Sequence, residues 1–152
     1  MERIKVLFLD MDGVVNCAEN QKQGLFKTDF PVDPYMAFLV GKIVLDTNCK
    51  VVLSSSWRHS VDNVEKINKQ MVDLLDVTGY EPYDDTKPPG IENCQRGREI
   101  KAWLDKHPEV EKYAILDDEN DMLPEQQPNF FKTSWSTGIT KEIAEAVTNH
   151  LK

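Results

Sequence analysis

Polar residues that can do chemistry directly follow three strand-like runs of apolar residues. They are Asp10 and Asp12, then Ser54, Ser55 and Ser56, and finally Asp117 and Asp118. Four carboxylates that converge on one site would repel one another unless a cation lay between them, and oxygen-only ligands suit a hard ion such as Mg2+. Gly13 follows the first pair and allows a tight turn whose N–H groups can face an anion. The pattern indicates a centre that binds a divalent cation and a phosphoryl group.

The elements that would position these residues alternate along the chain. Strands are expected at residues 4–9, 50–53, 112–116 and 130–133, and helices at 34–48, 61–75, around 100–104 and 140–151. Such alternation predicts a parallel α/β sheet with right-handed crossovers, and ligands bind beyond the carboxyl ends of its strands. The three polar segments should therefore meet at one edge of the sheet.

Length and composition fit one globular domain, and we expect residues 1–152 to form it. Of the residues, 40% are hydrophobic and 29% are charged, which is ordinary globular composition and argues against disorder. The net charge of −8 opposes extended non-specific binding to nucleic acid and binding to an anionic membrane.

Cysteine spacing and hydropathy bear on the compartment. The three cysteines form no CxxC pair, which argues against a zinc site and a disulfide framework. The most apolar window, residues 36–45, is too short for a membrane span, and residues 1–9 lack the features of a signal peptide. We expect a soluble, cytoplasmic protein with free thiols.

The ordered motifs resemble those of the haloacid dehalogenase (HAD) superfamily over residues 4–121. The matching residues are Asp10-Met11-Asp12-Gly13-Val14-Val15 as motif I, Ser54 as motif II, Arg96 as motif III and Asp117-Asp118 as motif IV. A closer similarity is to the small HAD domains found alone or within RNA-repair and polynucleotide kinase-phosphatase proteins. It is carried by Leu53-Ser54-Ser55-Ser56-Trp57-Arg58, by Arg96-Gly97-Arg98-Glu99-Ile100 with Trp103-Leu104, and by Gly138-Ile139-Thr140.

The resemblance implies a three-layer Rossmann-like fold around the parallel sheet. Only 36 residues separate Gly13 from Lys50, and 39 separate Ser56 from Arg96. Neither gap can hold a full cap domain in addition to its crossover helix. We therefore expect a capless protein with only small flaps, at residues 16–31 and 80–93.

The resemblance also implies roles for individual residues. Asp10 would be the nucleophile that forms an aspartyl-phosphate, and Asp12 the general acid and base. Mg2+ would be held by the carboxylates of Asp10 and Asp117 and the main-chain carbonyl of Asp12, with Asp118 close by. The expected phosphate-binding residues are Ser54, Ser55 and Arg96.

Several assignments remain open at this stage. Arg98 can replace Arg96, and Asp121 can replace Asp118 as the second motif IV acid. Arg58 has the geometry for bidentate phosphate contact, but a surface ion pair explains it equally well. Trp57 and Trp135 lie in polar loops where they can stack on nucleobases, whereas Trp103 lies on the apolar side of its helix and is expected in the core.

The expected function is Mg2+-dependent hydrolysis of phosphate monoesters through an aspartyl-phosphate. An open site would admit a phosphorylated small molecule or a nucleic-acid end, with nucleotides and polynucleotide ends as the leading substrate class. Two alternatives stay open: a non-catalytic HAD-fold binding or regulatory module, and a receiver-like domain that accepts phosphate on an aspartate.

Overall fold

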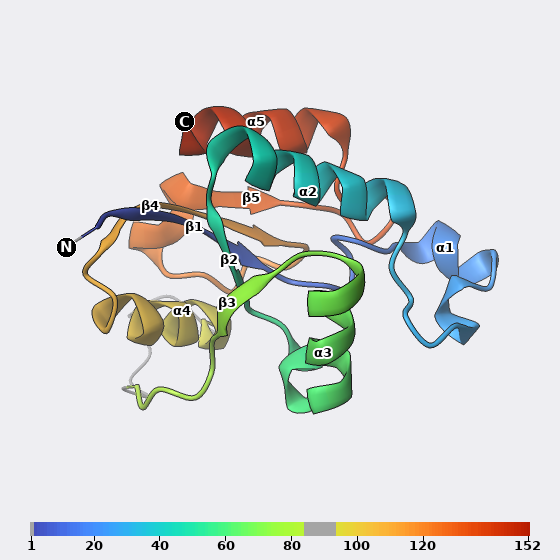
Figure 1. Ribbon diagram of the computed structural model, residues 1–152, viewed down its shortest axis with the longest axis horizontal. Coiled ribbons are helices and arrows are strands. Elements are labelled where there is room, and N and C mark those ends of the chain that lie inside the picture. The colour runs from blue at the N-terminus through green and yellow to red at the C-terminus, as the bar shows by residue number, and fades with distance from the viewer. Residues whose placement is uncertain (1, 84–93) are drawn as a thin grey trace.

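The apolar runs of the sequence form the strands of one parallel sheet. The computed structural model describes residues 2–83 and 94–152. Its strands are β1 (Ile4–Leu9), β2 (Lys50–Leu53), β3 (Leu74–Val77), β4 (Val110–Asp117) and β5 (Phe130–Lys132). They pair in the order β3-β2-β1-β4-β5, so that β1 lies between β2 and β4 at the centre of the sheet (Figure 1).

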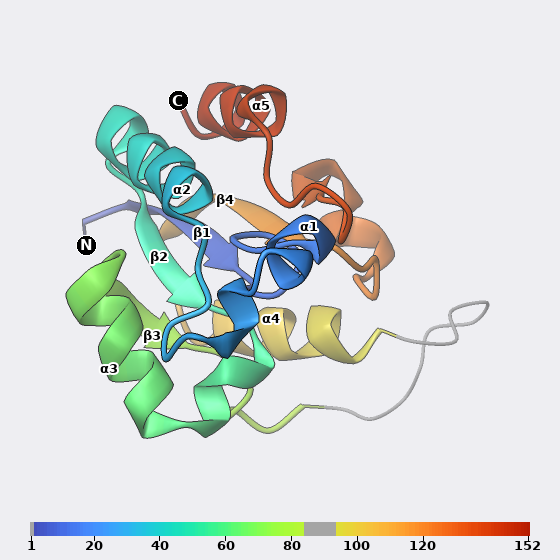
Figure 2. The same ribbon diagram turned by 90° about the vertical axis from the view of Figure 1, so that its right-hand side faces the viewer.

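Helices connect the strands and cover both faces of the sheet, as Figures 1 and 2 show. They are α1 (Ala18–Lys22), α2 (Pro34–Thr47), α3 (Val61–Gln70), α4 (Gln95–Asp105) and α5 (Lys141–Leu151), with short 3-10 helices η1 (Leu25–Lys27), η2 (Ser56–His59) and η3 (Pro124–Asn129). The predicted start of α2 is confirmed, because the Asp33 side chain accepts hydrogen bonds from the N–H groups of Tyr35 and Met36. The three-layer Rossmann-like α/β fold is likewise confirmed.

Side chains alternate between two cores along the central strands, as the period of two in a strand requires. Leu7 and Leu9 of β1 join the cluster that contains Leu39 of α2 and Val147 of α5. The intervening Phe8 joins the cluster on the other face, where Ile100 and Trp103 of α4 pack. Trp103 is fully buried, as expected from its helix position. The sheet is therefore fixed from both sides, and its strand ends are held in place.

The helix predicted over residues 61–75 is wrong in its last five residues. The helix α3 ends at Gln70, and Leu74–Val77 form the edge strand β3, which pairs in parallel with β2. The backbone of Met71 leaves helical geometry, and the Asn68 side chain accepts a hydrogen bond of 2.8 Å from the Leu74 N–H. Leu74 lies seven residues after Ile67, so it matched the helical period although it pairs in the sheet.

The segments expected as flaps differ in what can be said of them. Between β1 and α2, residues 16–31 contain only the short helices α1 and η1. Of the second segment, residues 80–83 are described, whereas residues 84–93 lie outside the described part of the chain. Among the helices described, none combines the length and the apolar character needed to cross a membrane.

Candidate active site

Three carboxylates meet where the adjacent strands β1 and β4 end. Asp10 directly follows β1 and donates its N–H to the Leu116 carbonyl at 3.0 Å, while Asp117 is the last residue of β4. One side-chain oxygen from each of Asp10, Asp117 and Asp118 lies within 4.8 Å of the others. Residues more than 100 positions apart in the sequence therefore form one acidic cluster.

The turn after β1 needs a glycine. Gly13 has a φ of +82°, a region that side chains disfavour, and a Cβ atom there would collide with the Asp118 carboxylate. Its N–H donates to Asn16 Oδ1 at 2.9 Å, and its carbonyl accepts a 2.6 Å hydrogen bond from the Thr133 hydroxyl. These contacts fix the turn that carries Asp12 and leave room for Asp118.

Burial makes it unfavourable for the acidic cluster to ionise without a cation. Burial raises the pKa of Asp10 from 3.8 to about 6, although the positive charge of Arg96 opposes the rise. Burial, followed by the negative charge of Asp10, raises the pKa of Asp117 to about 9. A divalent cation would remove this repulsion, and the three carboxylates supply the oxygen donors that Mg2+ prefers. The residues present thus fit the metal that the fold family implies.

Asp12 is held by two side chains. Its Oδ1 accepts from the Asn16 side-chain amide at 3.0 Å, and its Oδ2 accepts from the Trp57 indole N–H at 3.2 Å. The Trp57 ring lies 6.1 Å from the Phe30 ring, measured between centroids. The stacking role considered for Trp57 thus competes with a contact to the expected acid and base, and Trp135 packs edge-on against Phe26.

The three serines after β2 occupy different positions. Ser54 is buried, and its Oγ accepts from the Thr78 hydroxyl at 3.2 Å. Ser55 is also buried; it accepts from the Trp57 N–H, and its side chain hydrogen-bonds Asp10. Ser56 lines the cavity that contains the acidic cluster. Of the two predicted phosphate-binding serines, Ser55 contacts Asp10, whereas the Ser54 hydroxyl contacts Thr78, which follows β3.

The two candidate arginines of α4 face different surroundings. Arg96 lines the acidic cavity, and its charge acts on both Asp10 and Asp117. The Arg98 guanidinium lies over the Tyr83 ring, 5.5 Å from its centroid, and lines neither that cavity nor the one beside it. The geometry favours Arg96 as the motif III cation.

Arg58 makes an ion pair, but not at the surface. Its Nη2 lies 2.8 Å from Glu99 Oε2, and the two side chains are only 8% and 5% exposed. Its Nη1 donates to the Ser55 carbonyl at 3.2 Å. Arg58 also lines a second cavity, described below, so its expected place near the substrate is compatible with the ion pair.

The acidic cavity has a volume of about 220 Å3. It is lined by Asp10, Asp12, Ser56, Arg96, Asp117, Asp118, Glu119 and Asp121. Asp118 belongs to the carboxylate cluster, whereas Asp121 lies at the rim shared with the second cavity. Both candidates for the second motif IV acid are therefore near the site, with Asp118 closer to the other ligands.

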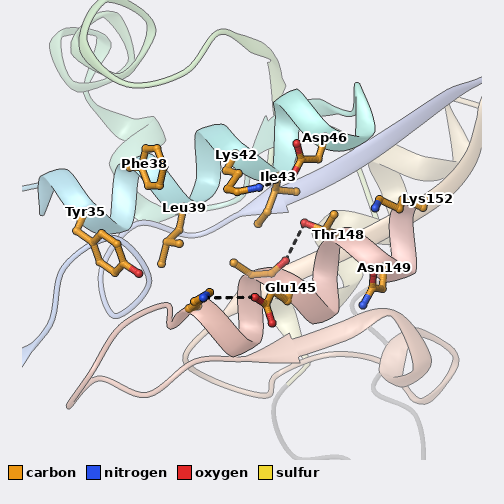
Figure 3. Close-up of a pocket in the computed structure, with 12 residues that line it drawn as sticks. Tyr35, Phe38, Leu39, Lys42, Ile43, Asp46, Glu145, Thr148, Asn149 and Lys152 are labelled. Carbon is orange, nitrogen blue, oxygen red and sulfur yellow. Dashed lines mark hydrogen bonds and ion pairs between the residues drawn. The ribbon is translucent and has the colours of Figure 1, made fainter.

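A groove elsewhere on the molecule has a different character. Figure 3 shows it between α2 and α5, with a volume of about 360 Å3 and with Tyr35 and Phe38 on one wall. Four of its charged side chains form two ion pairs, Lys42–Asp46 at 2.8 Å and Lys141–Glu145 at 4.0 Å. The groove shares no lining residue with the acidic cavity. The acidic cavity, by contrast, is lined by six acidic residues and one arginine, and this excess of carboxylates is what a metal-dependent reaction needs.

Two residues of the site were missed in the sequence. Asn16 is fully buried, and Glu99 is 4% exposed. A signal was present in both cases: Asn16 interrupts an apolar stretch three residues after Gly13, and Glu99 lies four residues before the core residue Trp103 on the same helix. A polar residue at a core position needs a partner, and here the partners are Asp12 and Arg58.

Comparison with known proteins agrees with this geometry. Neither the curated proteins nor the solved structures contain a significant match to the chain. The model of a protein family, described as the HAD domain in Swiss Army Knife RNA repair proteins, matches residues 6–144. That match covers the sheet except for the first two residues of β1, together with the acidic cluster and both arginines of α4, and the chain therefore belongs to this family of HAD domains.

Proposed function

We propose that the protein is a Mg2+-dependent phosphomonoesterase that works through an aspartyl-phosphate, with residues 1–152 as one HAD-like domain. The observation that carries the proposal is the convergence of Asp10, Asp117 and Asp118 with Arg96 around one cavity. Such a set combines a nucleophile, oxygen ligands for a hard cation and a donor for phosphoryl oxygens. Membership of the HAD family supports the same reaction class.

Asp10 is the proposed nucleophile. A carboxylate oxygen of Asp10 attacks phosphorus, and the bond between phosphorus and the ester oxygen breaks. Asp12 gives its proton to the departing alkoxide, so a neutral alcohol leaves. The contacts from Asn16 and Trp57 hold the Asp12 carboxyl group at the edge of the cavity for this transfer.

The second half-reaction regenerates the nucleophile. Asp12, now ionised, takes a proton from a water molecule, whose oxygen attacks the phosphorus of the aspartyl-phosphate. The bond to Asp10 breaks, and inorganic phosphate leaves. Arg96 binds the equatorial phosphoryl oxygens in both steps, together with N–H or O–H groups of Ser55 and Ser56.

Asp10, Asp117 and Asp118 are the residues that would hold Mg2+, with the main-chain carbonyl of Asp12 as a further ligand. When bound there, Mg2+ supplies positive charge that neutralises the carboxylates and the phosphoryl oxygens.

Nucleotides and polynucleotide ends are the proposed substrate class. The family description names RNA repair proteins, which supports a nucleic-acid end as the group that carries the phosphate. The net charge of −8 supports recognition of an end rather than of a long nucleic-acid tract. The three buried free cysteines support a reducing compartment, the cytoplasm.

Purified protein with p-nitrophenyl phosphate and a Mg2+ titration tests the reaction. We expect turnover that requires Mg2+ and falls at least about 10³-fold in Asp10→Asn. Asp105→Asn, which removes an exposed carboxylate on α4, is the matched control and should keep its activity. Undiminished turnover in Asp10→Asn would refute the nucleophile, and a stable phosphoprotein without turnover would favour the receiver-like alternative.

A further inference from the structure

A second cavity adjoins the acidic one. It has a volume of about 230 Å3, several times the ~30 Å3 of one water molecule in the liquid. The two cavities share Ser56, Arg96 and Asp121 as lining residues. A substrate whose scissile phosphate lies beside Arg96 would therefore extend its remaining atoms directly into this side cavity.

Two guanidinium groups of the side cavity have donors that the protein does not use. Arg58 Nε and Arg96 Nη1 are both buried, and neither has an acceptor among the described residues. Buried N–H groups are rarely left without an acceptor, and the Arg58 side chain is more than nine-tenths buried. Both arginines line the same cavity. This combination points to an acceptor-rich group that binds between them.

The charges of the two cavities also differ. Acidic side chains dominate the first, where Arg96 is the only cation among the described lining residues. The side cavity is lined by two cations, Arg58 and Arg96, by His59 and by two acids, of which Glu99 is paired with Arg58 and Asp121 lies at the shared rim. Cations and acids thus balance in the side cavity, and an anionic group meets less repulsion there than beside the carboxylates of the acidic cavity.

We propose that the side cavity binds a second phosphate of the substrate, so that the preferred substrate carries two phosphates on one sugar. The proposal rests on the phosphomonoesterase function proposed above and narrows its substrate class. A guanidinium fork matches phosphate oxygens and would satisfy the two unused donors. A nucleoside 3′,5′-bisphosphate has this chemistry, and so does a polynucleotide end whose terminal sugar carries a phosphate and a phosphodiester.

Binding to the Asp10→Asn protein in Mg2+ tests the second phosphate without turnover. Calorimetric titrations compare adenosine 3′,5′-bisphosphate with adenosine 3′-monophosphate and adenosine 5′-monophosphate. We expect the bisphosphate to bind at least about tenfold more tightly than the monophosphate that binds better. A tenfold gain in affinity corresponds to the lower end of the free energies that hydrogen bonds to a charged group contribute. A smaller gain overturns the proposal and means that water alone fills the cavity.

A further ligand separates the two sources of this chemistry. If a 3′-phosphorylated dinucleotide shows the same gain, the site recognises polynucleotide ends; if only the free bisphosphate does, it recognises nucleotides. Turnover of the 3′-monophosphate by the wild-type protein tests the proposed function separately. Turnover without the gain overturns only the side cavity, whereas the gain without turnover overturns only the hydrolase.

Paired variants test whether the gain arises in this cavity. Arg58→Met with Glu99→Met removes the buried ion pair without changing the net charge, and the gain should fall below about threefold. Lys101→Met with Asp105→Asn removes an exposed pair on the same helix and should leave the gain intact. If the gain survives the loss of Arg58, the second phosphate binds elsewhere and the assignment to this cavity is wrong.

Discussion

The buried ion pair between Arg58 and Glu99 gives a sharp test of how the strand-end loop after β2 is held. The change to make is Glu99→Gln, which keeps the size of the side chain and removes its charge. Arg58 would then stay buried with an ionised guanidinium and no counter-charge at 2.8 Å. Loss of one partner from a buried pair lowers the free energy of unfolding by about 3–5 kcal/mol, and we expect about 3 because glutamine still offers an acceptor.

The same helix provides the control. Lys101 and Asp105 form an ion pair at 2.9 Å, but their side chains are 53% and 63% exposed. Asp105→Asn removes a charge in the same way, and solvent screening limits the expected loss to less than about 0.5 kcal/mol. Distance alone would rank the two pairs as equal, so the comparison isolates burial.

Urea denaturation of both variants measures the difference. Arg58→Met with Glu99→Met should recover to within about 1 kcal/mol of the wild-type protein, because no charge is left without a partner. If Glu99→Gln loses no more stability than Asp105→Asn, or the double variant is less stable than the single one, the reasoning fails.

Two further predictions concern the acids of the site. Because burial raises the pKa of Asp117 from 3.8 to about 9, the folded protein without metal binds a proton that the unfolded chain releases. Its free energy of unfolding should therefore fall as the pH rises from about 4 to 9, and urea denaturation at several pH values in EDTA measures this fall. Asp117→Asn should make the free energy of unfolding less dependent on pH over this range. A free energy of unfolding that rises with pH would contradict the prediction. Trp57→Phe removes the 3.2 Å hydrogen bond to Asp12 but keeps an aromatic ring, so kcat should fall about tenfold while the Mg2+ dependence stays unchanged. Steady-state kinetics across a Mg2+ titration measures both quantities. An unchanged kcat would mean that this hydrogen bond does not matter for catalysis.

The central strands and the acids at their ends were predictable from the sequence because both follow from local patterns. A continuous apolar run indicates a strand buried on both faces, and parallel strands bring their carboxyl ends to one edge. This was enough to place Asp10 and Asp117 together. The edge strand β3 was not predictable in this way, because four residues with two leucines fit a helix as well as a strand.

Contacts between side chains far apart along the chain could not be predicted from the sequence. The hydrogen bond from Trp57 to Asp12 joins residues 45 positions apart, and that between Arg58 and Glu99 joins residues 41 apart. Neither follows from a sequence spacing, because each depends on how the segment after β2 lies relative to the turn after β1 or to α4. The choice between Arg96 and Arg98 likewise needed the orientation of α4, which the helical period alone does not give.

The hydrogen bond from Thr133 to Gly13 has a consequence for the size of the functional unit. It links residues 120 positions apart, and the neighbouring bond from the Ile139 N–H to the Val14 carbonyl reinforces it. A shortened chain that ended soon after Asp118 would retain every residue expected to do chemistry, yet the turn at Gly13 and Val14 would lose both of these hydrogen bonds. The segment that follows the last strand therefore stabilises the turn after β1. A deletion in this segment would displace Asp12, although the two lie near opposite ends of the chain.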